Sequence, residues 1–322
     1  MGQVVQTEGP RSTRARPLRP TDLVALAAFE ARAFRSEART CDRLHRAHRR
    51  PLAIATVLEQ WIAAEDRHTL VVPSGLGIRG LISARHRSGR AAWEVDWLVL
   101  APEDEDDEGA ALALLDGIAE EAIRAQVQRI FLRLPKESPL AGVARRTGFV
   151  LYGSEVLLKG SADHPSGHVP SLELRPRRKS DELGIFRLYH GAVPAQVRSM
   201  EGMTLEEWRA TREVRFWQQR EYVWDIEGRI RGWLQVNRGG AAGQLRLLLL
   251  PEDEDRMADL LALALGHLLR KREVLALVPH FQPGLRTLLQ EVWSYEEVAA
   301  YQNLARQLAV RVPEARLVPA RA

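Results

Sequence analysis

Short apolar stretches alternate with polar, glycine-containing turns along this 322-residue chain, and the same order of stretches occurs twice. In each half a short strand precedes helical segments, three strands follow, and an apolar helix comes next. A further strand, a short helix and a closing strand complete each half. The three central strands are expected at 69–72, 78–86 and 93–100 in the first half, and at 222–225, 230–237 and 244–250 in the second.

An identical acidic phrase marks the repeat. Pro102–Asp106 and Pro251–Asp255 both read Pro-Glu-Asp-Glu-Asp, and each lies between an apolar strand and an apolar helix. A repeat of this length indicates one structural unit written twice. Proline fits the first turn of a helix and acidic side chains are favoured there, so the phrase is interpreted first as a helix start.

Length and composition indicate two domains of about 150 residues each. The single cysteine, Cys41, excludes an internal disulfide and favours a cytoplasmic protein. No apolar run is long enough to span a membrane, and a net charge of +4 does not by itself indicate nucleic-acid binding. The expected parts are a flexible arm at 1–15, a domain at 16–159, a linker at 160–171, a second domain at 172–310 and a tail at 311–322.

The element order resembles the GNAT superfamily of N-acetyltransferases, doubled. Two stretches carry the resemblance: the strand end Leu98-Val99-Leu100-Ala101 before Pro102, and Arg145-Arg146-Thr147-Gly148-Phe149 before the closing strand. The resemblance implies an α/β (α+β) protein of two GNAT-like domains related by a pseudo-twofold axis. Each domain is expected to hold a mixed, mostly antiparallel sheet with helices on both faces, and the closing strands are the candidates for the contact between the halves.

The resemblance also implies an activity, an acyl-CoA-dependent N-acetyltransferase that uses acetyl-CoA and a small-molecule or peptide amine. The family binds the pantetheine along the fourth strand and the pyrophosphate at the next helix. On this sequence the backbone of the fourth strand would hold the pantetheine, the helix start would take the pyrophosphate, and a carboxylate on the strand would act as base through a water. These residues are, in that order, Leu98, Val99 and Leu100; Gly109, Ala110 and Ala111; and Glu94.

The sequence departs from the family pattern at three places. Both loops that would meet the pyrophosphate are acidic, and carboxylates there repel a diphosphate. The position of the family's frequent tyrosine acid is Ala144 in the first half and Leu288 in the second. The second half has Gln244 and Arg246 in place of strand carboxylates, so at most the N-terminal half is expected to be catalytic. Glu94 has a second interpretation, an ion-paired residue on a strand face.

The alternative is a non-catalytic, degenerate GNAT protein that binds a partner or small ligand through arginine-rich helices. Six arginines recur at intervals of three or four, which on a continuous helix makes one stripe. The stripe has a bland interpretation too, a solvated face balanced by nearby acids. Nucleic-acid binding by the stripe is a third, weaker hypothesis, and no metal site is predicted. The stripe consists of Arg32, Arg35, Arg39, Arg43, Arg46 and Arg50.

Overall fold

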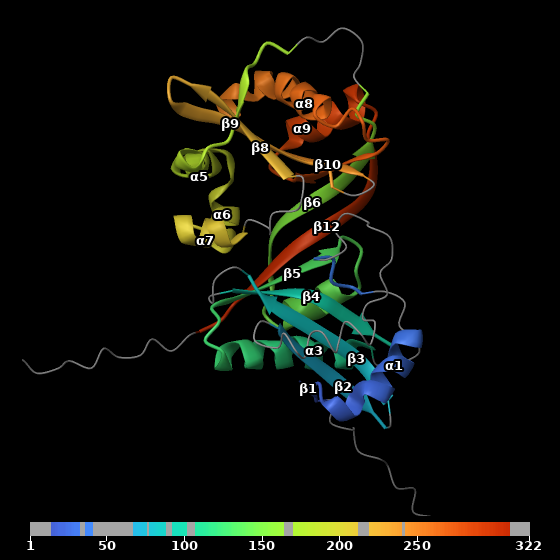
Figure 1. Cartoon of the computed structure of the whole chain (residues 1–322). Coiled ribbons are helices and arrows are strands. Elements are labelled where there is room, and N and C mark those ends of the chain that lie inside the picture. The colour runs from blue at the N-terminus through green and yellow to red at the C-terminus, as the bar shows by residue number, and fades with distance from the viewer. Residues whose placement is uncertain are drawn as a thin grey trace, which may run out of the picture.

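The strands of the two halves form one continuous sheet (Figure 1). The computed structural model describes residues 14–32, 36–40, 67–75, 77–87, 92–101, 107–163, 170–211, 219–239 and 242–309. Residues 1–13 of the expected arm, the tail and residues 164–169 of the linker lie outside these residues, as does the acidic phrase of the first half. The domain boundaries therefore stay a prediction.

The element order within each half follows the expectation. The first half contains β1 (Arg16–Pro17), α1 (Leu23–Arg32), β2 (Arg67–Ser74), β3 (Gly77–His86), β4 (Ala92–Leu100), α3 (Asp107–Arg124), β5 (Arg129–Pro135), α4 (Leu140–Arg146) and β6 (Val150–Gly160). The second contains β7 (Leu174–Pro176), α5 (Glu182–Ala192), α6 (Ala195–Glu201), α7 (Leu205–Thr211), β8 (Gln219–Ile226), β9 (Arg229–Asn237), β10 (Gly243–Leu249), α8 (Met257–Gly266), β11 (Val274–Pro279), α9 (Pro283–Thr287) and β12 (Glu296–Gln307).

The two closing strands are exchanged between the halves. The sheet order is β1-β2-β3-β4-β5-β12-β6-β11-β10-β9-β8-β7, so β12 pairs with β5 of the first half and β6 pairs with β11 of the second. In Figure 1 both strands cross the middle of the molecule between the two sets of helices. Read from either edge, the sheet presents the corresponding strands of the two halves in the same order, as a pseudo-twofold pair requires. The closing strands do join the halves.

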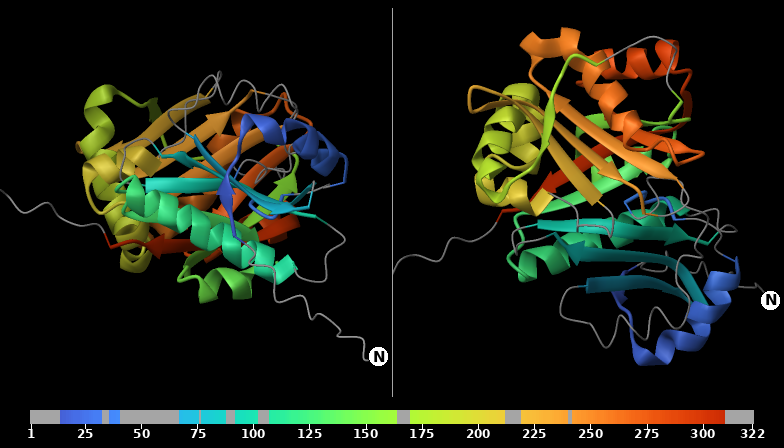
Figure 2. Two further views of the ribbon diagram at one scale, coloured as in Figure 1. Left: turned by 90° about the horizontal axis from the view of Figure 1, so that it is seen from below. Right: turned by 45° about the horizontal axis from the view of Figure 1, so that its top comes forward.

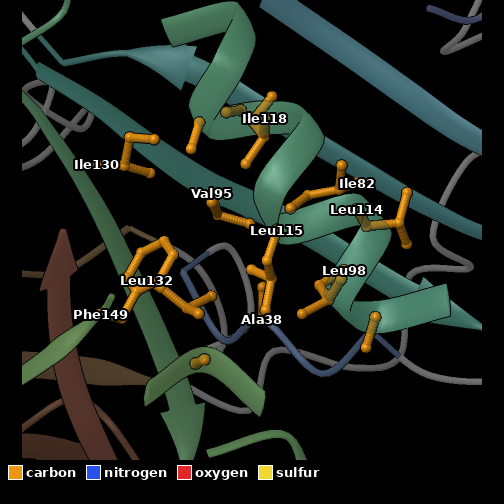
Figure 3. Packing of buried hydrophobic residues seen from close by; sticks show 14 of the residues in the cluster. Ala38, Ile82, Val95, Leu98, Leu114, Leu115, Ile118, Ile130, Leu132 and Phe149 are labelled. Atoms are coloured by element: carbon orange, nitrogen blue, oxygen red, sulfur yellow. The ribbon is translucent and has the colours of Figure 1, made fainter. Parts of the chain in front are cut away.

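Alternation along the strands explains why helices cover both faces of the sheet (Figure 2). In the first half Val95 and Leu98 pack under α3, whereas Leu81 and Val99 face α1. In the second half, alternate strand residues pack against α8 on one face and against α5, α6 and α7 on the other. Figure 3 shows the core beneath α3. The expected fold class, with helices on both faces of a mixed sheet, is confirmed.

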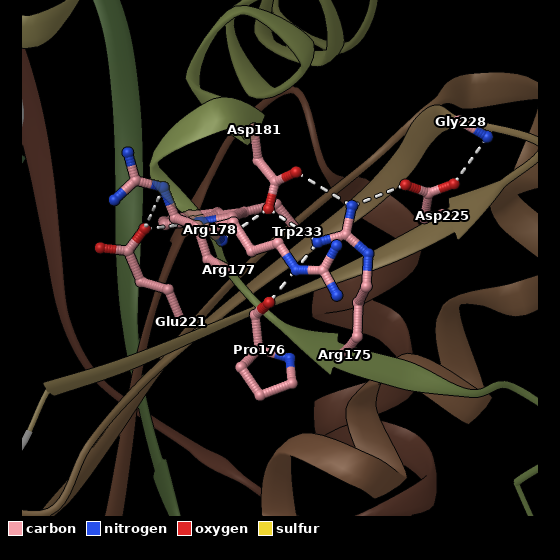
Figure 4. A network of polar contacts seen from close by, with 9 residues as sticks. All are labelled: Arg175, Pro176, Arg177, Arg178, Asp181, Glu221, Asp225, Gly228 and Trp233. Atoms are coloured by element: carbon pink, nitrogen blue, oxygen red, sulfur yellow. Dashed lines mark hydrogen bonds and ion pairs between the residues drawn. The ribbon is translucent and has the colours of Figure 1, made fainter.

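An arginine–aspartate pair closes the first strand onto the first helix in both halves. Arg16 holds Asp22 through two hydrogen bonds of 2.7 and 2.8 Å, and Arg175 holds Asp181 at 2.7 and 2.9 Å while also reaching Asp225 (Figure 4). Each aspartate also accepts a backbone N–H three residues before it, as a capping residue does. The pair marks equivalent positions in the two halves, because in each half the arginine and the aspartate are six residues apart.

The pair also corrects the sequence alignment of the two halves. The Leu-Arg-Pro triplets at 18–20 and 174–176 are alike in sequence, but in the structure Arg16-Pro17 is the counterpart of Arg175-Pro176. The triplet match was therefore displaced by three residues. Thr204 followed three residues later by Glu207 is the sequence pattern of a capping box. The structure confirms it at the start of α7, where the N–H of Glu207 donates to Thr204 Oγ1 and the N–H of Thr204 donates to the Glu207 carboxylate.

Candidate functional site

The strands β4 and β5 separate where the cofactor groove was expected. They pair in parallel only at Ala92–Glu94 with Arg129–Phe131. On the other side of β4 the pairing with β3 is irregular, because Ser83 faces Trp97 while Ala84 faces Val95, which leaves Asp96 as an extra residue. Such a bulge bends a strand. Beyond Glu94 the two strands therefore diverge, and the edge of β4 that faces β5 is left without a strand partner.

Residues 36–40 of the same chain lie in this gap. The N–H of Glu37 donates to the carbonyl oxygen of Leu98 at 2.6 Å, and the N–H of Leu98 donates to Ser36 Oγ at 3.0 Å. On the β5 side, the N–H of Arg39 donates to the carbonyl oxygen of Arg133 at 2.9 Å. The segment thus bridges the two diverging strands, and we call it the inserted segment.

Further contacts fix the inserted segment in place. Thr40 Oγ1 donates to the carbonyl oxygen of Val95 at 2.7 Å, and Ser138 Oγ donates to the Glu37 carboxylate at 2.9 Å. The methyl group of Ala38 is 1% exposed and belongs to the core beneath α3, next to Leu98 in Figure 3. The segment is therefore part of the core rather than a loop resting on it.

Of the backbone groups predicted to hold pantetheine, those of Leu98 already have partners. The N–H and C=O of Leu98 bond to the inserted segment. Val99 and Leu100 lie opposite Leu81 and Gly80 in the β3–β4 ladder. A thioester arm lying along β4 would have to displace residues 36–40, so the groove as it stands does not fit acetyl-CoA.

The predicted pyrophosphate residues form the start of α3. Gly109 is half-buried, and the methyl groups of Ala110 and Ala111 are fully buried in the core. The N–H of Gly109 belongs to the first turn of the helix, where such groups lack partners within the helix, whereas Ala110 and Ala111 follow that turn. The carboxylate of Glu108 pairs with Arg146 of α4. The acidic phrase that precedes this turn lies outside the described residues.

In the second half the acidic phrase contributes a carboxylate that pairs with a neighbouring strand. Asp253 is 7% exposed and receives two hydrogen bonds from Arg231 of β9, at 2.6 and 2.7 Å. In the first turn of α8, Asp259 accepts hydrogen bonds from the N–H and the hydroxyl of Ser171. The interpretation of the phrase as a helix start is confirmed here, since Pro251–Arg256 forms a 3-10 turn that leads into α8. Two carboxylates at this helix start are therefore paired within the chain, Asp253 with Arg231 and Asp259 with Ser171.

The predicted base, Glu94, faces two arginines. Its carboxylate oxygens lie 3.4 Å from Arg85 Nη2 and 3.3 Å from Arg87 Nη2, and its side chain is 13% exposed. The guanidinium of Arg87 also stacks 3.8 Å from the centre of the Phe131 ring. Paired cations favour the ionised, weakly basic form of a carboxylate. This arrangement matches the ion-paired interpretation of Glu94 more closely than that of a free base.

Asp96, the bulge residue of β4, is fully buried beside Arg67, whose Nη1 lies 2.5 Å from its carboxylate. Burial raises the pKa of Asp96 to about 6, although Arg67 and Arg85 act in the opposite direction. The sequence placed Asp96 and Glu94 on one strand face. In the structure Arg85 reaches both carboxylates, with its Nη2 3.4 Å from Glu94 and its Nε 4.0 Å from Asp96, whereas Arg87 pairs with Glu94.

A buried tyrosine–glutamate pair lies near Arg87 at the junction of the halves. Tyr152 of β6 donates to Glu201 of α6 at 3.0 Å. Burial raises the pKa of Tyr152 well above 10, with a further contribution from Glu201, and burial likewise raises the pKa of Glu201. The expectation that Tyr152 is a packing residue is confirmed, since it is 5% exposed within an apolar cluster. Glu201 was not identified from the sequence, because no pattern around it on α6 indicates that its carboxylate contacts Tyr152.

At the position of the family's tyrosine acid, Ala144 is fully buried in the core beneath α3, and Leu288 packs beside the core of the second half. Neither side chain carries a proton that could be transferred.

The arginine stripe is not one continuous helix. α1 ends at Arg32, and residues 36–40 are not helical. Arg39 is 3% exposed, so it does not belong to a solvated face. The remaining arginines of the stripe, at 35, 43, 46 and 50, lie outside the described residues. Binding of a partner by the stripe therefore stays a hypothesis, because most of its arginines lie outside the described residues.

Two further searches covered only the part of the chain that the structure describes. Within it, no three His, Cys, Asp or Glu side chains gather in a way that could hold a metal ion. None of its helices combines the length and the apolar character that a membrane span requires.

Comparison with solved structures identifies the fold. A GCN5-related N-acetyltransferase from Sphaerobacter thermophilus aligns with a TM-score of 0.55 at 14% identity, over 92% of this chain and 97% of that one. The tandem GNAT protein from the clavulanic acid biosynthesis pathway aligns with a TM-score of 0.50 at 16% identity, over 93% and 99%. A GCN5-related N-acetyltransferase from Anabaena variabilis aligns with a TM-score of 0.50 at 14% identity, over 91% and 72%.

The sequence comparisons, unlike the structure comparison, found no match. No protein-family model matches the chain, and no curated protein matches it. At identities of 16% or less, the likeness to solved structures concerns the backbone arrangement and not the site residues. This chain has the fold of a tandem GNAT acetyltransferase, with both copies of the module joined in one sheet.

Proposed function

We propose that the chain is a non-catalytic GNAT-fold protein in which its own residues replace acetyl-CoA. The observation that carries the proposal is the pair of hydrogen bonds between the Leu98 backbone and the inserted segment, through Ser36 Oγ and the N–H of Glu37. These are the backbone groups that a pantetheine arm would need. The Asp253–Arg231 pair and Asp259 support the same conclusion for the second half.

The free energy needed to displace the inserted segment is comparable with the binding free energy of a cofactor. The inserted segment makes five hydrogen bonds to β4, β5 and Ser138. At a net value of about 0.5–1.5 kcal/mol each, they oppose displacement by roughly 3–8 kcal/mol as an upper bound, because water would replace some of them. Micromolar binding of a ligand corresponds to about 8 kcal/mol. Displacement would therefore consume much of the binding free energy of a typical cofactor.

The side chains around the groove support the proposal further. Glu94 is held between Arg85 and Arg87, and Ala144 offers no proton. General acid–base catalysis requires a group whose pKa lies near the working pH and which reaches the substrate. Glu94 is poorly suited, because its two carboxylate oxygens are engaged by Arg85 and Arg87.

The second candidate is an acyl-CoA-dependent N-acetyltransferase with at most the N-terminal half active. The separation of β4 from β5 after Glu94 favours it, since it leaves an open strand edge of the kind on which the family resemblance places the cofactor. In this candidate the inserted segment must first leave the gap. Leu98 to Leu100 and Gly109 to Ala111 would then be the cofactor contacts, with Glu94 as base and a small-molecule or peptide amine as acceptor.

Calorimetric titration with acetyl-CoA, combined with hydrogen exchange at the Leu98 amide, separates the two candidates. The non-catalytic protein shows no acetyl-CoA-dependent change in Leu98 exchange. A cofactor that enters the groove must break the bond from the Leu98 N–H to Ser36 Oγ, so its exchange changes on binding. Saturable binding with such a change would overturn the proposal. If acetyl transfer were also lost in Glu94→Gln with binding intact, the enzyme candidate would be established.

A further inference from the structure

A basic pocket lies in the second half, away from the groove. Its cavity volume is about 470 Å³, within the range of about 300–1,000 Å³ that is typical of small-molecule sites. Arg220 stands at the start of β8, Arg238 follows β9, and the other lining residues come at and after the end of α8. The lining residues are Arg220, Arg238, His267, Leu268, Arg270 and Lys271, and we call this site the basic pocket.

The basic pocket is separate from the expected cofactor position. Asp253 and Asp259 surround the N-terminus of α8, whereas the pocket lies at its C-terminus. A helix of ten residues spans about 15 Å, so the two places lie at opposite ends of the second half's core. A ligand in the basic pocket would touch neither the acidic phrase nor the inserted segment.

The end of a helix explains only part of this charge. Cations near a helix C-terminus are favoured by the helix dipole, which accounts for Arg270 and Lys271. It does not account for Arg220 and Arg238, which two different strands bring to the same cavity. Among the lining residues that the structure describes, none is acidic. This contrasts with Arg175, which faces two carboxylates.

Ring stacking and packing fix the walls of the basic pocket. The His267 ring stacks on Tyr222 of β8, with centroids 4.3 Å apart and an interplanar angle of 10°. Leu268 is 1% exposed and anchors the segment in the core. A methyl group added to Gly243 would lie 3.2 Å from Lys271 Cγ, so the absence of a side chain there lets the lysine stem pack against β10. Burial lowers the pKa of His267, and Arg238 and Arg220, which line the same cavity, lower it further.

We propose that the basic pocket binds a small ligand with two or more phosphate groups, either inorganic pyrophosphate or the diphosphate of a nucleotide. Three arginines and a lysine around one cavity match several phosphate oxygens at once, and arginine binds such oxygens in bidentate geometry. The volume of about 470 Å³ suits a small molecule. A nucleic-acid backbone would instead need a basic strip along which to run.

Calorimetric titration of the full chain with inorganic pyrophosphate and with ADP tests the proposal. We expect saturable binding of one or both below about 1 mM, weakening as salt is raised. Arg238→Gln and Arg270→Gln should each weaken it by about tenfold or more, since each removes charge-assisted hydrogen bonds. Arg272→Gln is the matched control, because Arg272 is exposed beside the pocket but does not line it. Much tighter ADP binding would identify a nucleotide, and equal affinities the diphosphate alone.

Several results would overturn the proposal: no binding of either probe at 1 mM, an equal loss in Arg272→Gln, or binding only of an oligonucleotide. Because acetyl-CoA itself carries a diphosphate, its titration should be repeated in Arg238→Gln. Binding that disappears in this variant and leaves Leu98 exchange unchanged belongs to the basic pocket. Binding that survives and perturbs Leu98 belongs to the groove, so the two proposals fail independently.

Discussion

The inserted segment offers the sharpest single test, the substitution Ser36→Ala. Ser36 is 7% exposed, and its hydroxyl oxygen accepts the N–H of Leu98 at 3.0 Å. Its own proton goes to the carbonyl oxygen of Ala38 or of Leu98, at 3.1 and 3.3 Å. Alanine keeps the backbone and removes both bonds. The variant thus leaves a buried N–H on β4 with no partner.

An unpartnered buried donor costs about 1–3 kcal/mol. In domains of 150–250 residues each kcal/mol lowers the Tm by roughly 2–4 °C, so the Tm of Ser36→Ala should fall by roughly 2–12 °C. The Leu98 amide should also exchange faster, by roughly 5- to 150-fold if the whole loss appears as local opening. Differential scanning calorimetry and amide hydrogen exchange measure the two effects.

Ser199→Ala is the control for this measurement. Ser199 is exposed on α6, and its hydroxyl donates to the carbonyl oxygen of Gln196. Its removal should change the free energy of unfolding by less than about 0.5 kcal/mol. If Ser36→Ala were no more destabilising than Ser199→Ala, with Leu98 exchange unchanged, the inserted segment would not be held as described.

Three further outcomes are expected. Asp253→Asn should lower the Tm, because it breaks the bidentate bond to Arg231, whereas Asp255→Asn in the same phrase should leave it nearly unchanged, as that side chain is exposed; equal effects would contradict a structural role. The pKa values of Asp22 and Asp181 are lowered by their arginine partners, so their contribution is present above about pH 4 and is lost as the pH falls further, which urea unfolding at pH 2–5 would show. The pKa of Asp96 is raised to about 6, so its effect has the opposite sign: stability declines as the pH rises from about 4 to 6, and Asp96→Asn should remove that decline in urea titrations at pH 4–7.

Much of the architecture could be predicted from local patterns. The period-two alternation in β3, β4, β9 and β10 and the capping signal before α7 specify elements within a few residues of their observed bounds. The repeated acidic phrase indicates the duplication. The exchange of β6 and β12 could not be predicted, because an apolar strand pattern does not specify which neighbour it pairs with.

The candidate site was harder to predict for the same reason. Ser36, Ala38 and Thr40 are small residues in an arginine-rich stretch, and their interspersed arginines at helical spacing suggested a helix. Their hydrogen bonds to Leu98 and Val95 span about sixty positions in the chain, and no local signal encodes them. The triplet alignment, which matched Arg19 rather than Arg16 with Arg175, failed for a related reason, since the matching triplets are alike in sequence but not in contacts.

The exchange of closing strands constrains when this protein can fold. Arg133 of β5 bonds to Asn303 of β12 across 170 positions of the chain. During synthesis on the ribosome, β5 and β6 emerge long before β12, so each has an unpaired edge until β12 appears. Pairings this distant slow folding, and exposed strand edges invite association with other chains. Nascent chains of this protein should therefore depend on chaperones until β12 is released.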